Sequence, residues 1–77
     1  MDFKKLREYT DKHNTEILKM SKLYNVDEKY LKRLCQEIGF QIHYTYSDAI
    51  ILVNNDLENG LNINQIIIKY GIDKELI

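Results

Sequence analysis

The sequence predicts a mainly α-helical fold with three N-terminal helices, a small β-hairpin at about 40–53 and a C-terminal helix at about 62–70. Two observations lead to this fold class. Apolar residues recur every three or four positions over the N-terminal half and again near the C-terminus, as in amphipathic helices. Between these regions, the segment at 40–53 alternates apolar and polar residues, as a half-buried strand does. The alternative fold is all-α, with a fourth helix at 48–59 in place of the hairpin.

The length and composition of the chain predict one domain at residues 1–77. The chain contains no proline and no low-complexity tract, so nothing in it indicates a linker. The longest uncharged apolar run, at 49–53, is too short to span a membrane, and the N-terminus lacks the apolar segment of a signal peptide. The single cysteine, Cys35, is expected to pack as a small hydrophobe. We therefore expect a soluble, cytoplasmic protein with a reduced thiol.

The first helix is expected at Asp2–His13, with Asp2 as its N-cap. Its inner face would consist of apolar residues at helical spacing, and it would act as scaffold for the helices that follow. The residues of that face are Phe3, Leu6, Tyr9 and Thr10.

Two short amphipathic helices are predicted between Asn14 and Gly39. Asn14 or Thr15 would cap the first, which extends to about Tyr24, and Gly39 would end the second as a left-handed stop. Each has one inner face with the i, i+3, i+4, i+7 spacing of an amphipathic helix. These faces consist of Ile17, Met20, Ser21 and Tyr24 in the first helix and of Leu31, Leu34, Cys35 and Ile38 in the second.

A tight turn at Asn25-Val26-Asp27 is predicted to join these two helices. Asn tolerates a left-handed backbone better than most residues, Val26 offers an apolar side chain to the core, and Asp27 can cap the next helix. Two helices that cross steeply at such a turn require a small residue where they touch, and Ser21 occupies that position.

With these features, the window 17–36 resembles the helix-turn-helix motif of bacterial and phage DNA-binding proteins. In that motif the fifth residue of the window is small and the ninth is usually Gly, and these positions hold Ser21 and Asn25. The resemblance implies a regulator of transcription that binds double-stranded DNA. The same periodicity also fits a plain αα-hairpin in a small helical domain. The positions that the motif keeps apolar hold Met20, Tyr24, Val26, Leu31 and Leu34.

The resemblance implies that the helix after the turn reads DNA with its outer face, at Lys29, Lys32, Arg33 and Gln36. Arg33 is suited to a bidentate contact with guanine, and Gln36 is suited to pairing with adenine. The two lysines would more often hold phosphates. Glu28 is unfavourable at the entry of this helix, because an acid there repels the DNA backbone.

Positive and negative charges are segregated along the chain, although the net charge is only -1. Residues 1–35 carry nine Lys or Arg against six Asp or Glu, whereas residues 36–77 carry two against six. A basic half that contains the reading helix favours phosphate binding, because phosphate neutralisation supplies most non-specific DNA affinity. Amphipathic helices also solvate their outer faces with lysines, so the asymmetry is compatible with a protein that binds no DNA.

The alternation at 40–53 favours a hairpin whose two strands pair across Ser47-Asp48. The order of three helices and a hairpin then resembles a winged helix, whose wing would touch the DNA backbone or the minor groove. Ser-Asp is not a favoured two-residue turn, since such turns prefer Asn-Gly or a Gly.

The alternative interpretation makes Ser47 an N-cap and Gly60 the stop of a helix at 48–59. The chain then resembles the twin helix-turn-helix domain of AraC-type regulators, with YLKRLC in the first recognition helix and IIIKYGI at the second turn. It departs from that pattern because it is shorter between the two glycines and because Ile67 stands where the pattern has a small residue.

The C-terminal helix at 62–70, capped by Asn62 or Asn64 and ended by Gly71, is followed by further apolar residues. One face of a small core cannot bury all of them, and an exposed apolar patch is typical of an interface. We therefore expect a homodimer through a dimerisation tail at 61–77, with interface residues Ile63, Ile67, Ile68 and Leu76.

The sequence contains no catalytic pattern and no metal-binding pattern. The residues His13, Cys35 and His43 are too few and too irregularly spaced for a zinc site, which has four closely paired ligands. There is no Gly-rich phosphate loop and no Ser/His/Asp order. We therefore expect no enzymatic activity, no metal and no cofactor.

Two classes of function fit the sequence. The first is a small sequence-specific DNA-binding regulator of transcription that acts as a homodimer on a two-fold related site. The second is a non-DNA protein-interaction module, such as an inhibitor or antirepressor from a phage or other mobile element, that binds a protein target through its apolar tail. Neither class has a membrane as its partner.

Overall fold

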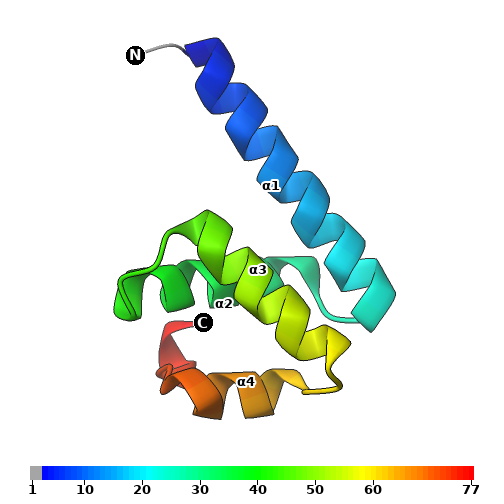
Figure 1. The fold of residues 1–77 in the computed structure, drawn as a ribbon, viewed down its shortest axis with the longest axis vertical. Coiled ribbons are helices and arrows are strands. Elements are labelled where there is room, and N and C mark those ends of the chain that lie inside the picture. Colours follow the sequence, from blue (N-terminus) through cyan, green and yellow to red (C-terminus); the bar gives the residue numbers. More distant parts are fainter. Residues whose placement is uncertain (1–2) are drawn as a thin grey trace.

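The computed structural model describes residues 3–77, which form four α-helices followed by a short 3₁₀ helix. No strand occurs in this part of the chain, so the all-α alternative is confirmed. In Figure 1, α2 and α3 lie between α1 and α4, in agreement with the packing of α1 on α2 and α3 and of α4 on α3. The elements are α1 (Phe3–Tyr24), α2 (Glu28–Gln41), α3 (Tyr46–Glu58), α4 (Ile63–Tyr70) and the 3₁₀ helix η1 (Lys74–Leu76).

The helix α1 is continuous over 22 residues, so the predicted break at Asn14 or Thr15 is wrong. The reason is that polar side chains in this region bond within the helix instead of capping a new one. Thr15 Oγ1 donates to the Asp11 carbonyl oxygen at 2.8 Å, and His13 Nδ1 donates to the Tyr9 carbonyl oxygen at 2.7 Å. The N-cap that we expected at Asp2 lies outside the described residues.

The first ten described residues, Phe3–Lys12, form an arm that leaves the helical bundle (Figure 1). Every residue of the arm is exposed, and α1 becomes buried only from His13 onward. The prediction that Phe3, Leu6 and Tyr9 face a core is therefore wrong, because α1 extends beyond the part of the bundle that could cover them.

The β-hairpin predicted at 40–53 is absent, and with it the wing of a winged helix. This segment instead contains the end of α2, a four-residue link at 42–45 and the first part of α3. Thr45, rather than Ser47, is the N-cap of α3, since its Oγ1 accepts from the Asp48 backbone N–H at 3.1 Å. This segment forms a helix instead of a hairpin because the helix places one apolar face against the core. That face consists of Ala49, Ile50, Val53 and Leu57.

Gly39 does not end α2, which continues to Gln41. It is needed for a close approach of two segments: a Cβ atom at this position would lie 3.0 Å from the Tyr44 carbonyl oxygen. The chain reverses later, at His43, whose φ is 60°. The glycine therefore lets the link at 42–45 pack against α2.

The helix α4 agrees with the prediction of a helix at 62–70. Asn62 is its N-cap and forms a capping box with Gln65, in which each side chain accepts from the other's backbone N–H at 2.9 Å. Gly71 ends the helix with φ 65°, in the left-handed region that glycine adopts without strain. Both ends of this short helix are thus fixed by local sequence.

Three of the links between helices have the same local structure. Each contains a residue at positive φ, namely Asn25 (56°), Gly60 (91°) and Gly71 (65°). The next residue is apolar and packs against the core, and its backbone N–H donates to the carbonyl oxygen five residues earlier at 3.0 Å in all three links. The third residue caps the following helix with its side chain. The apolar residues are Val26, Leu61 and Ile72, and the caps are Asp27, Asn62 and Asp73.

Every α-helix contributes buried apolar side chains to the core. α2 contributes the greatest number of fully buried apolar side chains, and none of its four is exposed to solvent. The residues with 0 or 1 % exposure are Ile17, Leu31, Leu34, Cys35, Ile38, Ala49, Val53 and Ile66. Among the helices of residues 3–77, none combines the length and the apolar character needed to cross a membrane.

Candidate nucleic-acid interface

The outer face of α2 holds the four residues predicted to contact DNA. Lys29, Arg33 and Gln36 are exposed and follow one another at i, i+4 and i+7, so they lie along one side of the helix. Lys32 is half-buried beside them. Phe40 continues the same side one turn later and is 81 % exposed. The surface is thus polar and basic over most of its length and apolar at its end.

The opposite face of α2 fixes the orientation of that surface. Leu31, Leu34, Cys35 and Ile38 are all 0 % exposed and pack into the core. A rotation of α2 about its axis would expose these four side chains, which makes the rotation unfavourable. The direction in which Arg33 points is therefore set by the core.

The turn at Asn25-Val26-Asp27 has the geometry predicted from its sequence. Asn25 has a left-handed backbone with φ 56°, and Val26 is half-buried against the core. The prediction that Asp27 caps α2 is confirmed, because its Oδ2 accepts from the Tyr30 backbone N–H at 2.9 Å. Ser21 is buried next to the turn, and its carbonyl oxygen accepts from the Val26 N–H at 3.0 Å.

Charges near this surface are mixed. Glu28 is exposed in the first turn of α2, where a carboxylate is favourable to the helix dipole. Lys22 is exposed in the last turn of α1, on the other side of the turn, and adds a positive charge. Glu37 is half-buried and accepts from the Gln41 side chain at 2.9 Å.

Cys35 lies beneath the surface and not on it. Burial raises the pKa of its thiol to about 12, so the sulfur stays protonated and unreactive at neutral pH. The pKa of Tyr46 is likewise raised to about 12, first by burial and then by the charges of Cys35, Tyr9 and Glu16. The Cys35 thiol and the Tyr46 hydroxyl therefore belong to the packed interior.

His13 is buried where α1 meets α3, with its ring 5.5 Å from that of Tyr46. Its Nε2 and the Tyr46 hydroxyl are buried without a hydrogen-bond partner in the described chain. His43 is exposed in the link at 42–45. Within residues 3–77, no three His, Cys, Asp or Glu side chains gather as a metal site would require.

Asp56 ties α4 to α3 by an interaction that the sequence does not reveal. This carboxylate is 5 % exposed and accepts from Lys69 Nζ and from the Tyr70 hydroxyl, each at 2.6 Å. The hydrogen bond to Asp56 is the main reason that the pKa of Lys69 is raised, whereas burial is the main reason for the raised pKa of Tyr70. One of the two basic residues in 36–77 is therefore paired with a carboxylate of the same chain, although its side chain is 49 % exposed.

The four residues expected in a dimer interface divide between core and surface. Ile67 is 6 % exposed and belongs to the core, and Ile63 is half-buried against it. Ile68 and Leu76 are 78 % and 55 % exposed. The tail therefore offers two apolar side chains to a partner, fewer than the sequence led us to expect.

Other exposed apolar residues were not predicted as interface residues. Phe3, Leu6 and Tyr9 on the arm, with Tyr44 and Ile51 near the start of α3, are between 48 and 78 % exposed. Only the path of α1 past the edge of the bundle exposes the first three, and no local sequence signal marks that edge.

No protein-family model, curated protein or solved structure matches this chain.

Proposed function

We propose that this protein is a small sequence-specific DNA-binding regulator that inserts the outer face of α2 into the major groove of double-stranded DNA. The observation that supports this most is the division of α2 into a fully buried apolar face and a polar, basic face at 28–36, next to a three-residue turn. A rigid helix with one free polar face is what a major groove about 12 Å wide admits. The resemblance of 17–36 to a helix-turn-helix agrees with this role.

In this proposal the residues of α2 divide their tasks. Arg33 makes a bidentate contact with guanine, and Gln36 pairs with adenine. Lys29 and Lys32 hold phosphates and fix the register of the helix in the groove. Lys22, exposed at the end of α1, contacts the backbone beside the same groove.

Glu28 limits the strength of this interaction. Its carboxylate favours the N-terminus of α2 but lies at the entry of the reading helix, close to where phosphates would pass. DNA affinity is then modest and depends strongly on salt concentration, because few cations offset the repulsion.

A second candidate function is supported by the apolar end of the same surface. Phe40 and Tyr44 are 81 % and 50 % exposed and lie around the C-terminal end of α2. Exposed aromatic residues are typical of contacts with proteins more than of contacts with phosphates. A protein-interaction module would use these two residues and would not need Arg33.

Selection of bound duplexes from a random-sequence pool at low salt tests the first function. We expect an enriched sequence, and binding to it should fall about 10- to 100-fold for Arg33→Ala. Lys32→Ala should weaken binding to all sequences and lower the dependence on salt. Lys74→Ala removes the same charge from η1 and serves as the matched control.

The outcome separates the two functions. If no sequence is enriched and the Arg33 and Lys74 variants behave alike at low salt, DNA reading by α2 is wrong. Capture of a protein that is lost with Phe40→Ser and kept with Arg33→Ala would then support the second function.

A further inference from the structure

The arm of α1 is an uncovered continuation of a buried helix face. Along α1, one stripe repeats at spacings of three or four residues. Its later members His13, Ile17 and Met20 are 3, 1 and 5 % exposed, whereas Phe3 and Leu6 at its start are 78 and 48 % exposed. The same face that packs against α2 and α3 thus runs on into solvent.

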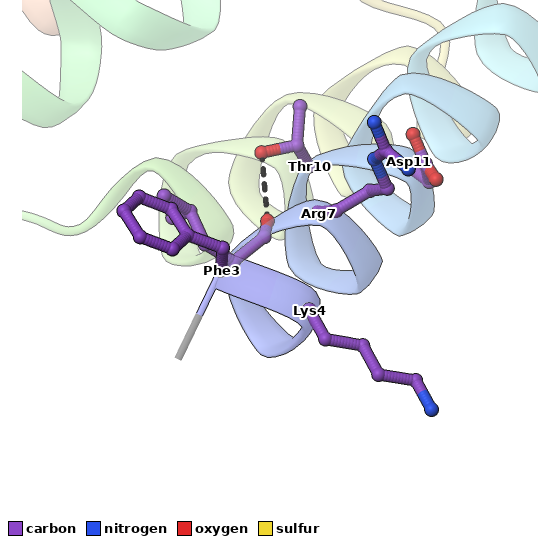
Figure 2. Close-up of a pocket in the computed structure, with 6 residues that line it drawn as sticks. Phe3, Lys4, Arg7, Thr10 and Asp11 are labelled. Carbon is purple, nitrogen blue, oxygen red and sulfur yellow. Dashed lines mark hydrogen bonds between the residues drawn. The ribbon is translucent and has the colours of Figure 1, made fainter. Parts of the chain in front are cut away.

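The arm also carries most of the positive charge near this stripe. Between residues 3 and 12 there are four Lys or Arg and two Asp or Glu. A shallow depression on the arm is lined by Phe3, Lys4, Leu6, Arg7, Thr10 and Asp11. Figure 2 shows Asp11 beside the Arg7 side chain and Thr10 Oγ1 donating to the Leu6 carbonyl oxygen at 3.0 Å. The arm is therefore a basic helix with an apolar stripe.

A surface with one exposed acid among apolar residues lies near the start of α3. A second shallow depression is lined by Tyr44, Asp48, Ile51 and Leu52, which we call the acceptor surface. Tyr44 and Ile51 are 50 and 56 % exposed, and Asp48 is exposed between them. The sequence has no Lys or Arg from 34 to 68, and Lys19 of α1 lines a neighbouring depression that shares Ile51 with this surface.

The two surfaces lie close enough for a reciprocal exchange between two copies of the chain. The arm leaves the bundle at His13, whose ring stacks on Tyr46 at the start of α3, two residues from Tyr44 and Asp48. In a two-fold arrangement, if the arm of one copy reaches the acceptor surface of the second copy, the arm of the second copy also reaches the acceptor surface of the first. Such a two-fold arrangement forms both contacts at once.

The area also favours two contacts over one. A Phe or Tyr that becomes fully buried covers about 150–250 Å², and Phe3 and Tyr9 still have 78 and 48 % of their surface exposed. In a two-fold dimer each copy buries both its own arm and its own acceptor surface, so both areas count toward the roughly 800 Å² per partner that a stable interface buries. A single arm on a single acceptor surface would be short of this value.

We propose that two copies of this chain form a dimer in which the arm of each copy (Phe3–Lys12) packs on the acceptor surface of the other (Tyr44, Asp48, Ile51 and Leu52). The stripe of Phe3, Leu6 and Tyr9 covers Ile51 and Tyr44, and Arg7 lies near Asp48. This dimer does not depend on DNA binding, and its interface is not the tail at 61–77.

Sedimentation equilibrium without DNA tests the dimer through charge reversal on each side. Arg7→Glu on the arm and Asp48→Lys on the acceptor surface should each weaken dimerisation about tenfold or more. Both side chains are exposed, and circular dichroism with thermal unfolding verifies that each variant folds. Ile51→Lys, at another exposed position, is a second acceptor variant that leaves the first turn of α3 unchanged.

Mixing the two weakened variants gives the most specific result. An equimolar mixture of the Arg7→Glu and Asp48→Lys proteins should dimerise as strongly as the unchanged protein, because both contacts in the mixed dimer again join opposite charges. Lys74→Glu, a charge reversal on η1, should leave dimerisation unchanged.

Three results would overturn the proposal. The protein could remain a 9.2 kDa monomer up to the highest concentration measured. It could dimerise without sensitivity to Arg7, Asp48 and Ile51, which would place the contact elsewhere. Finally, Arg7→Glu could lower binding to random duplex DNA and leave the mass unchanged, which would make the arm a DNA contact.

Discussion

At the scale of single residues, burial governs the chemistry of Cys35. Its side chain is 0 % exposed, and the pKa of its thiol rises from 9.0 to about 12. A thiol held in this way is neither a nucleophile nor a metal ligand at neutral pH. Its titration instead becomes a property of folding, because the unfolded chain releases the proton at a lower pH than the folded protein does.

Alkaline pH should therefore destabilise the protein through Cys35. Above the unfolded pKa of 9.0 the unfolded state binds fewer protons than the native state, so the free energy of unfolding falls as the pH rises toward about 12. The loss should be about 1.4 kcal/mol per pH unit. Urea titrations at several pH values between about 8 and 10 give the free energy of unfolding at each pH. Its decrease with pH should be smaller for Cys35→Ala than for the unchanged protein. Equal slopes would contradict the buried thiol.

The Tyr46 hydroxyl is a polar group that the described structure leaves buried and without a partner. Removing such a group costs no hydrogen bond and relieves a desolvation penalty. We expect Tyr46→Phe to leave the free energy of unfolding unchanged or to raise it by up to about 1 kcal/mol. For comparison, Leu34→Ala at a fully buried position should lower it by about 3 kcal/mol. Chemical denaturation of both variants checks the contrast, and a large loss for Tyr46→Phe would indicate an unseen partner.

At the scale of elements, helix ends that a local residue fixes were predictable, whereas the uninterrupted middle of a long helix was not. Asp27, Asn62 and Gly71 act as the caps or stops that their residue types predict. Thr15 was misinterpreted because the same hydroxyl can cap a helix or bond back to a carbonyl within it, and only the tertiary structure decides.

The prediction of a hairpin at 40–53 was wrong for a similar reason, because local sequence did not decide between two structures. Phe40, Ile42 and Tyr44 alternate with polar residues, but the run is too short to distinguish a strand from a helix end and a link. The helix α3 forms because Ala49 and Val53 then meet the core beside α2, and this benefit depends on residues distant in sequence.

Gly39 provides a test of how closely two elements approach. In an ordinary helix interior, Gly→Ala raises stability by about 1 kcal/mol. Here the added Cβ would lie 3.0 Å from the Tyr44 carbonyl oxygen and 3.3 Å from two backbone atoms of Thr45, so we expect Gly39→Ala to lower stability instead. Asn55→Ala, at an exposed position of α3, is the control and should raise it slightly. Thermal unfolding compares the stability of the two variants. A higher stability for Gly39→Ala would show that the backbone of the link at 42–45 shifts at little cost to accommodate the added Cβ.

At the scale of the whole molecule, the helical phase of α2 made its outer residues predictable. Leu31, Leu34 and Cys35 define one face by spacing alone, so the exposure of Lys29, Arg33 and Gln36 follows from the sequence. The exposure of the arm does not follow from it, because that depends on where the rest of the bundle ends. The sequence therefore led to one candidate surface and missed the other.

Charge on the molecule as a whole should limit DNA binding, with Glu28 as the nearest acid. Glu28→Gln removes the repulsion at the entry of α2 and keeps the size of the side chain. We expect an increase in affinity of about threefold for duplex DNA at low salt, shrinking as salt rises. Fluorescence anisotropy measures the change, with Glu58→Gln on α3 as the control. An effect of equal size in the control would mean that net charge alone is responsible.

The links between helices have a final consequence for how this protein meets any partner. They contain three residues at 25–27, four at 42–45, four at 59–62 and three at 71–73. Links this short leave no segment between residues 3 and 77 that could fold over a bound molecule or adapt to a mismatched one. Insertions should be poorly tolerated in them, since one extra residue would rotate the next helix. A partner that fits imperfectly must therefore change its own shape, by bending if it is DNA.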